Sequence, residues 1–388
     1  MKISQNIYLK LFKYKPLKKK LPKYLKSLLN DKSQLMISLT RFYKNSYNKK
    51  LIFKYKKYSK INLIGMGGSS LGARSIYFFL KEKIKKEFRF FDNLSFKNEI
   101  INPKKKILNL IISKSGNTLE TIANVNFIIK KNQRNIFITE NKNNYLMTLA
   151  KKLKSDVVFH NNFIGGRFSV LSEVGMLPAE LMGLNQSKFK QFNTLVKNKR
   201  FINALISNVS AMLNCANKNK TNSIILNYDE NSTDLFYWYQ QLIAESLGKK
   251  NKGLLPIIST LPKDNHSLMQ SYLDGPKNNF FTFFFVKENP SIKINNKNLL
   301  KSHFFLKNKS MYDIKKAQFE ATQKVFDKKN IPFRSFVIDK RKEETLGELF
   351  TFFILETILL GKALNINPLD QPAVELIKKE TKKNFNFQ

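Results

Sequence analysis

The sequence predicts an α/β protein made of two units in tandem, each a parallel sheet covered by helices on both faces. Short runs of branched apolar residues alternate along the chain with longer stretches of helical periodicity. Fully apolar strands that alternate with helices are typical of parallel sheets, because both faces of such a sheet are buried. With 388 residues, the chain is long enough to bury a sizeable core and to form two domains.

Three segments are predicted along the chain. Residues 1–55 form a basic helical segment, residues 56–216 a first α/β domain, and residues 217–388 a second domain that ends in a helix. The polar run at 217–222 marks the boundary between the two domains. A long apolar helix is predicted over 168–183. Strands are predicted at 61–64, 107–112, 135–139, 156–159, 223–227, 280–285 and 333–338.

The composition is strongly basic, with 69 Lys and Arg against 28 Asp and Glu and a formal net charge of +41. The lysines are scattered over the whole length, and Asn, Ile and Phe are also abundant, which indicates a compositional bias of the kind that AT-rich coding produces. Because the chain has no nucleic-acid-binding motif, a nucleic-acid partner is not expected. No apolar stretch approaches the roughly 18 to 20 residues that span a bilayer, so no membrane contact is expected either.

One cysteine, Cys215, excludes an internal disulfide and fits a reducing compartment, so we expect a cytoplasmic protein. The sequence contains no cluster of His, Cys and carboxylates with the spacing of a metal site. Neither a metal nor an organic cofactor is therefore expected.

A phosphate cradle is predicted where the strand at 107–112 runs into Ser113, Lys114, Ser115, Gly116 and Thr118. The helix that follows offers unpaired N–H groups and a partial positive charge at its N-terminus, and the hydroxyls add short donors. The alternative is an ordinary capped turn, since Ser and Thr are also good N-caps.

A second turn, at 65–72, is rich in glycine but fails the dinucleotide-binding pattern, because Ser70 stands where the third glycine is needed. Glycines such as Gly67 let backbone N–H groups and Ser69 approach a small polar ligand; the alternative is a helix-capping turn. Arg167, which follows two glycines behind the fourth predicted strand, is suited to neutralising an oxyanion or a phosphate. The alternative is a surface arginine beside the end of an element.

Two further segments carry groups suited to proton transfer. Gln241 and Glu245 are four residues apart and share one face of a helix, near whose C-terminus a carboxylate is electrostatically disfavoured. His266 lies at a loop-to-helix junction, where histidines are good candidates for acid–base work. A solvated surface pair is the alternative for Gln241 and Glu245, and the terminal helix after Gln371 could simply close the core.

These segments, in this order, resemble the sequence blocks of the phosphoglucose isomerase family. The matching blocks are Gly-Met-Gly-Gly-Ser at 65–69, Ser-Lys-Ser-Gly-Asn-Thr-Leu-Glu-Thr at 113–121, Gly-Gly-Arg-Phe-Ser at 165–169, 241–249, the loop of His266, and 371–378. The resemblance implies two tandem sugar-isomerase domains and the reversible isomerisation of glucose 6-phosphate and fructose 6-phosphate in glycolysis and gluconeogenesis. It also implies a homodimer whose active site is shared between subunits, with the histidine contributed by the partner.

The resemblance also implies roles for individual residues. Glu245 resembles the base that moves a proton between C1 and C2, and Arg167 the group that holds the charge of the enediolate. His266 and Lys378 resemble the groups that assist ring opening. The positions implied to bind substrate are Gly67, Ser69, Ser113, Lys114, Ser115, Thr118, Glu120, Gln241 and Gln371.

The sequence departs from the family pattern at Ala373 and Ile377, where glycine is usual, and Ile377 places a bulky side chain beside Lys378.

Three alternatives for the function remain open at this point. The enzyme could also accept mannose 6-phosphate, or the chain could be a non-catalytic sugar-phosphate-binding regulator, although no helix-turn-helix is found in residues 1–55. A nucleic-acid-binding role, suggested only by the charge, ranks third.

Overall fold

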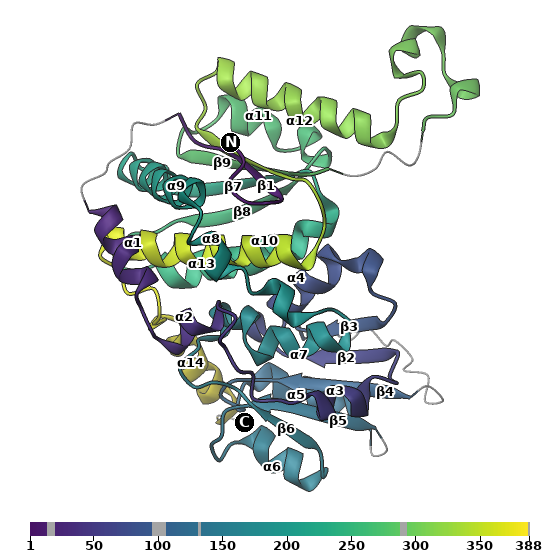
Figure 1. Ribbon diagram of the computed structural model, residues 1–388, viewed down its shortest axis with the longest axis vertical. Helices are drawn as coiled ribbons and strands as arrows, with labels where there is room; N and C mark the ends of the chain where they lie inside the picture. Colours follow the sequence, from purple (N-terminus) through teal and green to yellow (C-terminus); the bar gives the residue numbers. More distant parts are fainter. Residues whose placement is uncertain (14–19, 95–105, 131–132, 288–292, 387–388) are drawn as a thin grey trace.

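The computed structural model describes residues 1–13, 20–94, 106–130, 133–287 and 293–386. Two five-stranded sheets occupy opposite parts of the molecule, and helices fill the space between them (Figure 1). The predicted class, two α/β units in tandem with helices flanking parallel sheets, is confirmed. The domain limits at 55/56 and 216/217 stay predictions.

The first sheet has the strand order β3-β2-β4-β5-β6, and all its neighbouring pairs are parallel. Every residue of β4 is buried, as the apolar run predicts. From β2 the chain goes to one side to form β3 and then returns to the other side to form β4, so the topology switches between β2 and β4. The strands are β2 (Lys60–Ile64), β3 (Glu87–Phe91), β4 (Ile107–Ile112), β5 (Arg134–Thr139) and β6 (Asp156–Phe159).

The second sheet has the order β1-β10-β9-β7-β8. Its four strands from the second half of the chain are parallel, and β1 joins β10 in antiparallel orientation at the edge. One face of this sheet is covered by a cluster of phenylalanines on β9, β10 and α12 (Met311–Lys328). The strands are β1 (Ile7–Lys10), β7 (Asn222–Asn227), β8 (Leu255–Thr260), β9 (Asn279–Val286) and β10 (Phe333–Ile338).

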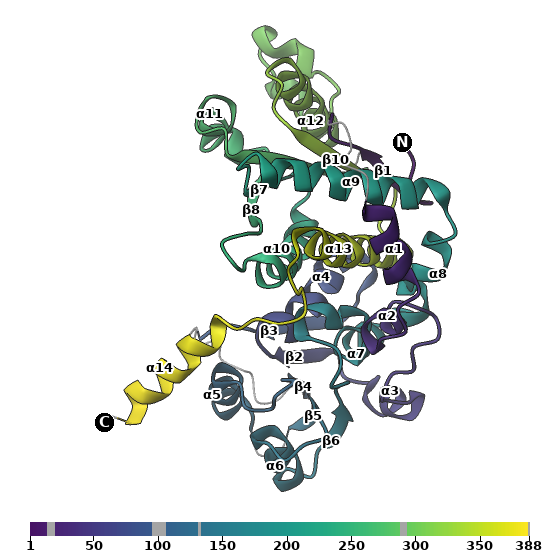
Figure 2. The ribbon, with the colours of Figure 1, turned by 90° about the vertical axis from the view of Figure 1, so that its left-hand side faces the viewer.

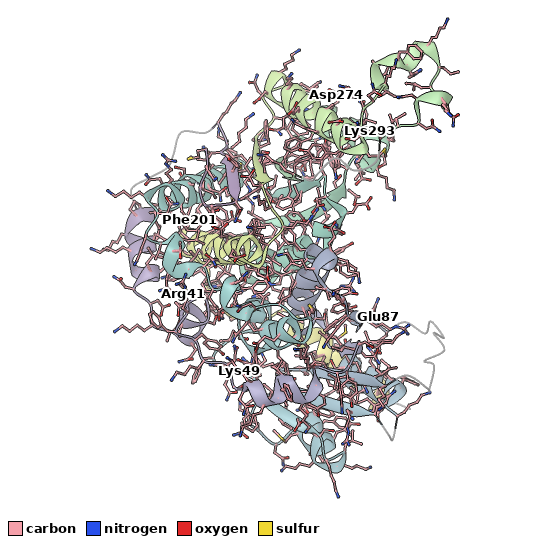
Figure 3. All side chains as sticks on the ribbon, turned by 45° about the vertical axis from the view of Figure 1, so that its right-hand side comes forward. Arg41, Lys49, Glu87, Phe201, Asp274 and Lys293 are labelled. Carbon is pink, nitrogen blue, oxygen red and sulfur yellow. The ribbon has the colours of Figure 1, made fainter. Side chains whose placement is uncertain are left out.

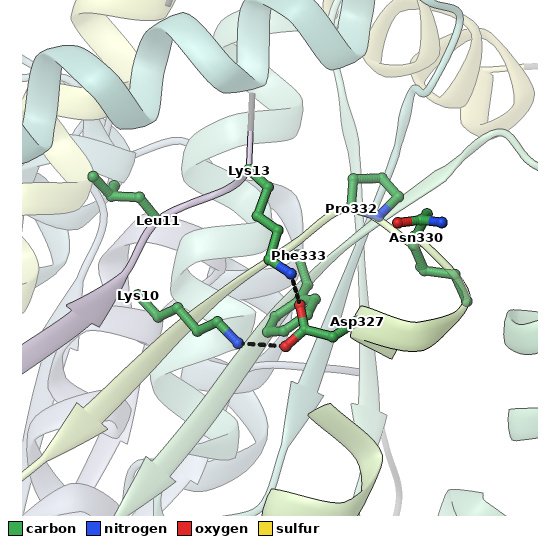
Figure 4. Close-up of a pocket in the computed structure, with 8 residues that line it drawn as sticks. Lys10, Leu11, Lys13, Asp327, Asn330, Pro332 and Phe333 are labelled. Atoms are coloured by element: carbon green, nitrogen blue, oxygen red, sulfur yellow. Dashed lines mark hydrogen bonds and ion pairs between the residues drawn. The ribbon is translucent and has the colours of Figure 1, made fainter. Parts of the chain in front are cut away.

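The N-terminal segment differs from its prediction as a purely helical element, because Ile7–Lys10 forms β1 and adds to a sheet whose other strands come more than 200 residues later. The end of β1 is tied to α12 by Lys10 and Lys13, whose ammonium groups each lie 2.8 Å from a carboxylate oxygen of Asp327 (Figure 4). The two hydrogen bonds hold the pKa of Asp327 below its ordinary value. These contacts fix the strand, whose four residues alone carry too weak a pattern to be predicted.

Two more strands and one helix break differ from the sequence-based expectation. β3 was not predicted because Glu87 and Arg89 interrupt its apolar pattern, and β8 was not predicted because it contains Pro256. Proline is tolerated there since β8 is an edge strand. The helix predicted over 168–183 is instead a 3₁₀ segment, η3 (Gly166–Leu171), followed by α7 (Glu173–Leu181), with Ser172 between them.

The helices pack on and between the sheets, and α13 runs through the middle of the molecule, seen end-on in Figure 2. α13 is buried along nearly its entire length, which explains why it is apolar on all sides. No helix of the described residues is long and apolar enough to cross a membrane. The α-helices are α1 (Leu21–Leu29), α2 (Gln34–Ser38), α3 (Lys49–Tyr55), α4 (Leu71–Phe79), α5 (Leu119–Ile128), α6 (Tyr145–Lys152), α7, α8 (Phe192–Leu195), α9 (Lys199–Asn217), α10 (Thr233–Leu247), α11 (Met269–Asp274), α12 (Met311–Lys328), α13 (Glu343–Leu364) and α14 (Val374–Asn386).

The basic side chains are spread over the surface rather than gathered on one face. Nitrogen-tipped side chains project all around the molecule in Figure 3, where Lys293 lies far from Arg41 and Lys49. This distribution agrees with a compositional bias.

A buried ion pair joins the second sheet to α13. Arg334 on β10 and Glu356 on α13 are both fully buried and are hydrogen-bonded to each other. Tyr239 on α10 donates to Glu356 at 2.7 Å and accepts from Arg334 at 3.0 Å. Burial raises the pKa of the Tyr239 hydroxyl well above its ordinary value. This network therefore fixes α10 relative to the sheet and to α13.

We expect Glu356→Gln to lower the free energy of unfolding by about 3–5 kcal/mol, because it leaves the buried guanidinium of Arg334 without its counter-charge. The matched control is Glu320→Gln, which removes an exposed carboxylate 3.9 Å from Lys316 and should cost less than about 0.5 kcal/mol. Urea unfolding of both variants measures the difference. Equal losses would show that the buried pair adds nothing to stability beyond a surface pair.

Candidate active site

A cavity of about 300 Å³ lies at the carboxyl ends of β2 and β4, at the switch point of the first sheet. Ligands of open α/β sheets bind at such points, because the strand ends there leave a crevice between diverging loops. Helix α10 and the chain that follows α13 close the cavity from the side of the second sheet. Its lining residues are Met66, Gly68, Ser69, Lys114, Ser115, Thr118, Glu140, Gly166, Arg167, Gln241, Glu245, Gln371 and Lys378.

The turn at 113–118, which is predicted to be a phosphate cradle, is tightly packed around Gly116. Gly116 has a φ of +68°, and a Cβ there would lie 2.0 Å from Oδ1 of Asn144, so only glycine fits this turn. Ser115 and Thr118 line the cavity, directly before the first turn of α5. The unpaired N–H groups at that helix start make the turn suitable for an anion.

Ser113 does not line the cavity. Its side chain is buried and lies 2.9 Å from the hydroxyl of Thr118, and it accepts a hydrogen bond from the Gly116 N–H at 3.2 Å. Ser113 therefore shapes the cradle from below instead of presenting its hydroxyl to a ligand in this conformation.

The glycine turn after β2 brings two loops into backbone contact. A Cβ on Gly68 would lie 2.2 Å from the carbonyl carbon of Gly166, so the turn after β2 and the turn after β6 touch. Gly67 has a φ of +53°, and a Cβ there would lie 2.7 Å from Nε2 of Gln241. Gly67 is thus needed for the approach of α10, although its own atoms do not line the cavity. These contacts place Ser69 and Arg167 on one wall.

Arg167 is the most heavily bonded side chain of the cavity. Its side chain is 3% exposed, and each of its five N–H groups has an acceptor within the protein. Burial lowers the pKa of its guanidinium, and the neighbouring Glu245 opposes that shift. The acceptors are Ser246 Oγ at 2.8 Å, Glu245 Oε2 at 3.3 Å, Gln371 Oε1 at 2.6 Å, and the carbonyls of Pro368 at 2.8 Å and Asp370 at 3.0 Å.

A ligand oxyanion can reach Arg167 only by replacing one of these acceptors. The Glu245 and Gln371 side chains both bond Nη1 and both line the cavity, so Nη1 is the group that faces a ligand. The Nε and Nη2 donors are held by Ser246 and by backbone carbonyls, and they keep the plane of the guanidinium fixed.

Glu245 combines accessibility with fixed geometry. It lies in the last turn of α10, and Gln241 one turn earlier donates to its Oε1 at 3.0 Å. Arg167 holds the other oxygen, while the side chain remains 28% exposed toward the cavity. A carboxylate held in this way can accept a proton from a carbon atom placed over it and return that proton, without needing to reorient.

Two other predicted residues lie outside the cavity lining. Glu120 is half-buried in the first turn of α5, and His266 is exposed in η6 (Lys263–His266), beyond the end of β8. Lys378, by contrast, reaches the cavity from α14. The roles that the sequence assigned to the site residues stay predictions.

The sequence reasoning missed Glu140, which lines the cavity beside the cradle. It directly follows β5, and its carboxylate lies 3.6 Å from the ammonium of Lys114 and 3.1 Å from that of Lys142. The signal was available, since a polar residue just after a buried parallel strand falls on the same edge as the other loops. Among the described residues, no three His, Cys, Asp or Glu side chains come together as a metal site would require.

The arrangement defines a class of protein: a two-sheet α/β fold whose switch-point cavity joins an anion cradle to a carboxylate and a buried arginine. Solved structures share this fold. A hypothetical protein from Thermus thermophilus superposes with a TM-score of 0.80 at 22% identity, over 94% of both chains. A glucose-6-phosphate isomerase from Chlamydia trachomatis superposes with a TM-score of 0.66 at 21% identity, over 87% of this chain and 72% of the other.

Sequence comparison places the chain within that class. Residues 45–261 match the family model described as phosphoglucose isomerase. The glucose-6-phosphate isomerase of Methanocaldococcus jannaschii is 32% identical over 84% of this chain and 85% of its own length. That of Campylobacter jejuni is 31% identical over 83% of this chain and 84% of its own length. The chain belongs to the phosphoglucose isomerase family.

We expect Gly116→Ala to cost more stability than Gly183→Ala, although both glycines have positive φ. Each substitution adds backbone strain of about 1–3 kcal/mol. Only the first also forces Asn144 away from the cradle, since nothing lies within 4 Å of a Cβ on Gly183. Urea unfolding and titration with inorganic phosphate measure the two effects. Equal losses, with phosphate affinity unchanged in Gly116→Ala, would contradict the close packing of the cradle.

Proposed function

We propose that this protein catalyses the reversible isomerisation of glucose 6-phosphate and fructose 6-phosphate, in glycolysis and gluconeogenesis. The observation that carries the proposal is Glu245, held by Arg167 and Gln241 in the cavity that also contains the phosphate cradle. The names of its relatives, which are glucose-6-phosphate isomerases, support the same reaction.

The phosphate would bind in the cradle, where Ser115, Thr118 and Ser69 line the wall and the start of α5 offers backbone N–H groups. The phosphate is remote from the reacting carbons. Its binding energy therefore serves to fix the sugar chain relative to Glu245, which lowers the entropic part of the barrier. The Lys114 ammonium is engaged by the Asn162 carbonyl at 2.8 Å, so we assign binding to the backbone amide of Lys114.

In the aldose-to-ketose direction, Glu245 takes the proton from C2, and the C1 carbonyl oxygen becomes the negatively charged oxygen of a cis-enediolate. The proton of the C2 hydroxyl passes to the C1 oxygen, the Glu245 carboxylic acid returns its proton to C1, and C2 becomes the carbonyl carbon. Arg167 stabilises the charge on the enediolate oxygen through Nη1, where it releases Gln371 or Glu245. No atom is gained or lost over the cycle, so neither an oxidant nor a reductant is required.

Ring opening requires an acid and a base at the ring oxygen and the C1 hydroxyl. Lys378 lines the cavity, whereas His266 of the same chain lies outside it, so we infer a homodimer in which His266 of the partner subunit completes the site. Exposed apolar side chains support a partner surface: Leu376 and Ile377 on α14 are 65% and 70% exposed, and Phe305 is 70% exposed. We place this enzyme in the cytoplasm.

Glu245→Gln should reduce turnover of fructose 6-phosphate about 10²- to 10⁴-fold, because an amide cannot accept the carbon-bound proton. Formation of glucose 6-phosphate by the purified protein is the measurement. Glu230→Gln serves as the control, since it neutralises an exposed carboxylate just before α10 and should leave turnover unchanged. Full activity in Glu245→Gln would remove this residue from its role, and an inactive wild type would refute the proposed reaction.

Mixing two inactive variants tests the shared site. In a randomised mixture of Glu245→Gln and His266→Ala, half of the dimers are hybrids, and each hybrid has one site free of both changes if the histidine comes from the partner. Activity should then recover to about a quarter of the wild-type value. No recovery although native mass spectrometry shows that hybrid dimers have formed, or a protein that sediments as a monomer, would contradict the shared site.

A further inference from the structure

Lys249, two residues after the end of α10, binds a distant part of the chain. Its ammonium donates to the carbonyl of Asn367 at 2.6 Å and to both the carbonyl and the carboxylate of Asp370. All three donors of the ammonium are therefore used on a single turn, and the side chain is 12% exposed. The bond from Lys249 also holds the pKa of the Asp370 carboxyl below its ordinary value.

The turn that Lys249 binds connects α13 to α14. Within it, the Asn367 amide donates to Asp370 at 3.1 Å and accepts from the Leu369 N–H at 3.0 Å. Arg167 bonds the carbonyls of Pro368 and Asp370 from the cavity side. Two cations thus hold the turn from different sides, and together they satisfy carbonyls that no regular element pairs.

Directly beyond this turn, the side chain of Gln371 accepts a hydrogen bond from Arg167 at 2.6 Å. In Figure 2, α14 projects away from the rest of the molecule, and Leu376 and Ile377 on this helix are exposed. A further cavity of about 700 Å³, lined in part by Lys249, Lys250 and Lys252, adjoins the turn, so close packing does not hold the turn on that side. Gln371 and Lys378, however, line the active-site cavity. Their positions depend on the direction in which the chain leaves the turn.

We propose that Lys249 is a positioning residue, which fixes the 367–370 turn and through it places Gln371 and Lys378 at the substrate. The proposal rests on the isomerase function proposed above. The hydrogen bonds of Lys249 go to Asn367 and Asp370 and not to the cradle or Glu245, so its loss should leave binding of the phosphate intact and should act on the steps that need Gln371 and Lys378. The expected signature is a fall in kcat with little change in KM.

Lys249→Met keeps the length of the side chain and removes its charge and donors. We expect kcat for fructose 6-phosphate to fall by up to about 10²-fold, the size of effect that a displacement of roughly 1 Å can cause. KM and inhibition by inorganic phosphate should stay within about twofold, and amide hydrogen exchange over 367–386 should rise. Lys249→Arg, which can bond the same oxygens, should recover part of the lost turnover. Asp370→Asn, which keeps the carbonyl, is expected to shift turnover and exchange in the same direction by less.

The matched control is Lys250→Met, which removes an exposed lysine that lines the same cavity of about 700 Å³ as Lys249. This variant should change neither turnover nor hydrogen exchange. Wild-type kinetics together with wild-type exchange in Lys249→Met would overturn the proposal. Faster exchange with unchanged kcat would also overturn it, since the turn would then not position the site. If the wild-type protein does not isomerise the substrate while exchange still rises in Lys249→Met, the proposed function fails and the attachment of the turn stands.

Discussion

The guanidinium of Arg167 joins three parts of the chain that are far apart in sequence. Arg167 lies in η3, which follows β6; it bonds Ser246 and Glu245 on α10, and it bonds Gln371 and the Pro368 carbonyl beyond α13. Each of these segments supplies a wall of the cavity. Because the side chain is buried and always charged, its donors must be satisfied, and the surrounding chain is folded so that they are. The site exists only where the first sheet, α10 and the C-terminal segment meet at this group.

The fold explains how the first sheet, α10 and the C-terminal segment can all contact Arg167. The switch between β2 and β4 opens the edge of the first sheet, and the glycines at 67 and 68 let α10 and the loop after β6 approach to backbone distance. α10 itself is fixed from the other side by Tyr239 in the buried network of Arg334 and Glu356. The second sheet therefore contributes to the site by holding the helix that carries the carboxylate, although its strand ends lie outside the cavity lining.

Much of this could be predicted from the sequence. The apolar run at 107–112 predicted a buried strand, and it forms β4. Gln241 and Glu245 share one face of α10, as their spacing predicted, and the roles of this pair and of the cradle stay predictions. Elements set by long-range contacts were not predictable: β1 depends on a strand more than 300 residues away, and β3 and β8 have charges or a proline in their patterns. A local pattern can predict a strand. It cannot show that a segment becomes a strand only by pairing with a strand far along the chain.

Some properties of the site residues were also predictable from local patterns, and others were not. Local patterns identified polar groups at the strand ends. They could not show that Ser113 faces the interior of its turn while Glu140 lines the cavity. Nor could they show that Lys249 and Arg167 bind one turn, because the side chain and its acceptors are more than 100 residues apart. The resemblance to phosphoglucose isomerases identified the residue types, and only the three-dimensional arrangement identified which neighbours hold them.

The scattered positive charge has no single partner in the described structure and fits a bias of composition. It still raises the local concentration of small anions near any cleft, which suits a sugar-phosphate substrate. The charge should therefore affect the rate of substrate capture more than the chemical step, which depends on groups inside the cavity.

In the proposed reaction, Glu245 moves a carbon-bound proton between C1 and C2. Isomerisation of fructose 6-phosphate in D₂O, followed by NMR of the glucose 6-phosphate formed, tests this proton transfer. The side chain of Glu245 is 28% exposed, so its proton can exchange with solvent. Deuterium should therefore accumulate at C2 as the reaction runs to equilibrium. Complete conversion without any deuterium on carbon would indicate direct hydride transfer between the two carbons and would contradict proton transfer by Glu245.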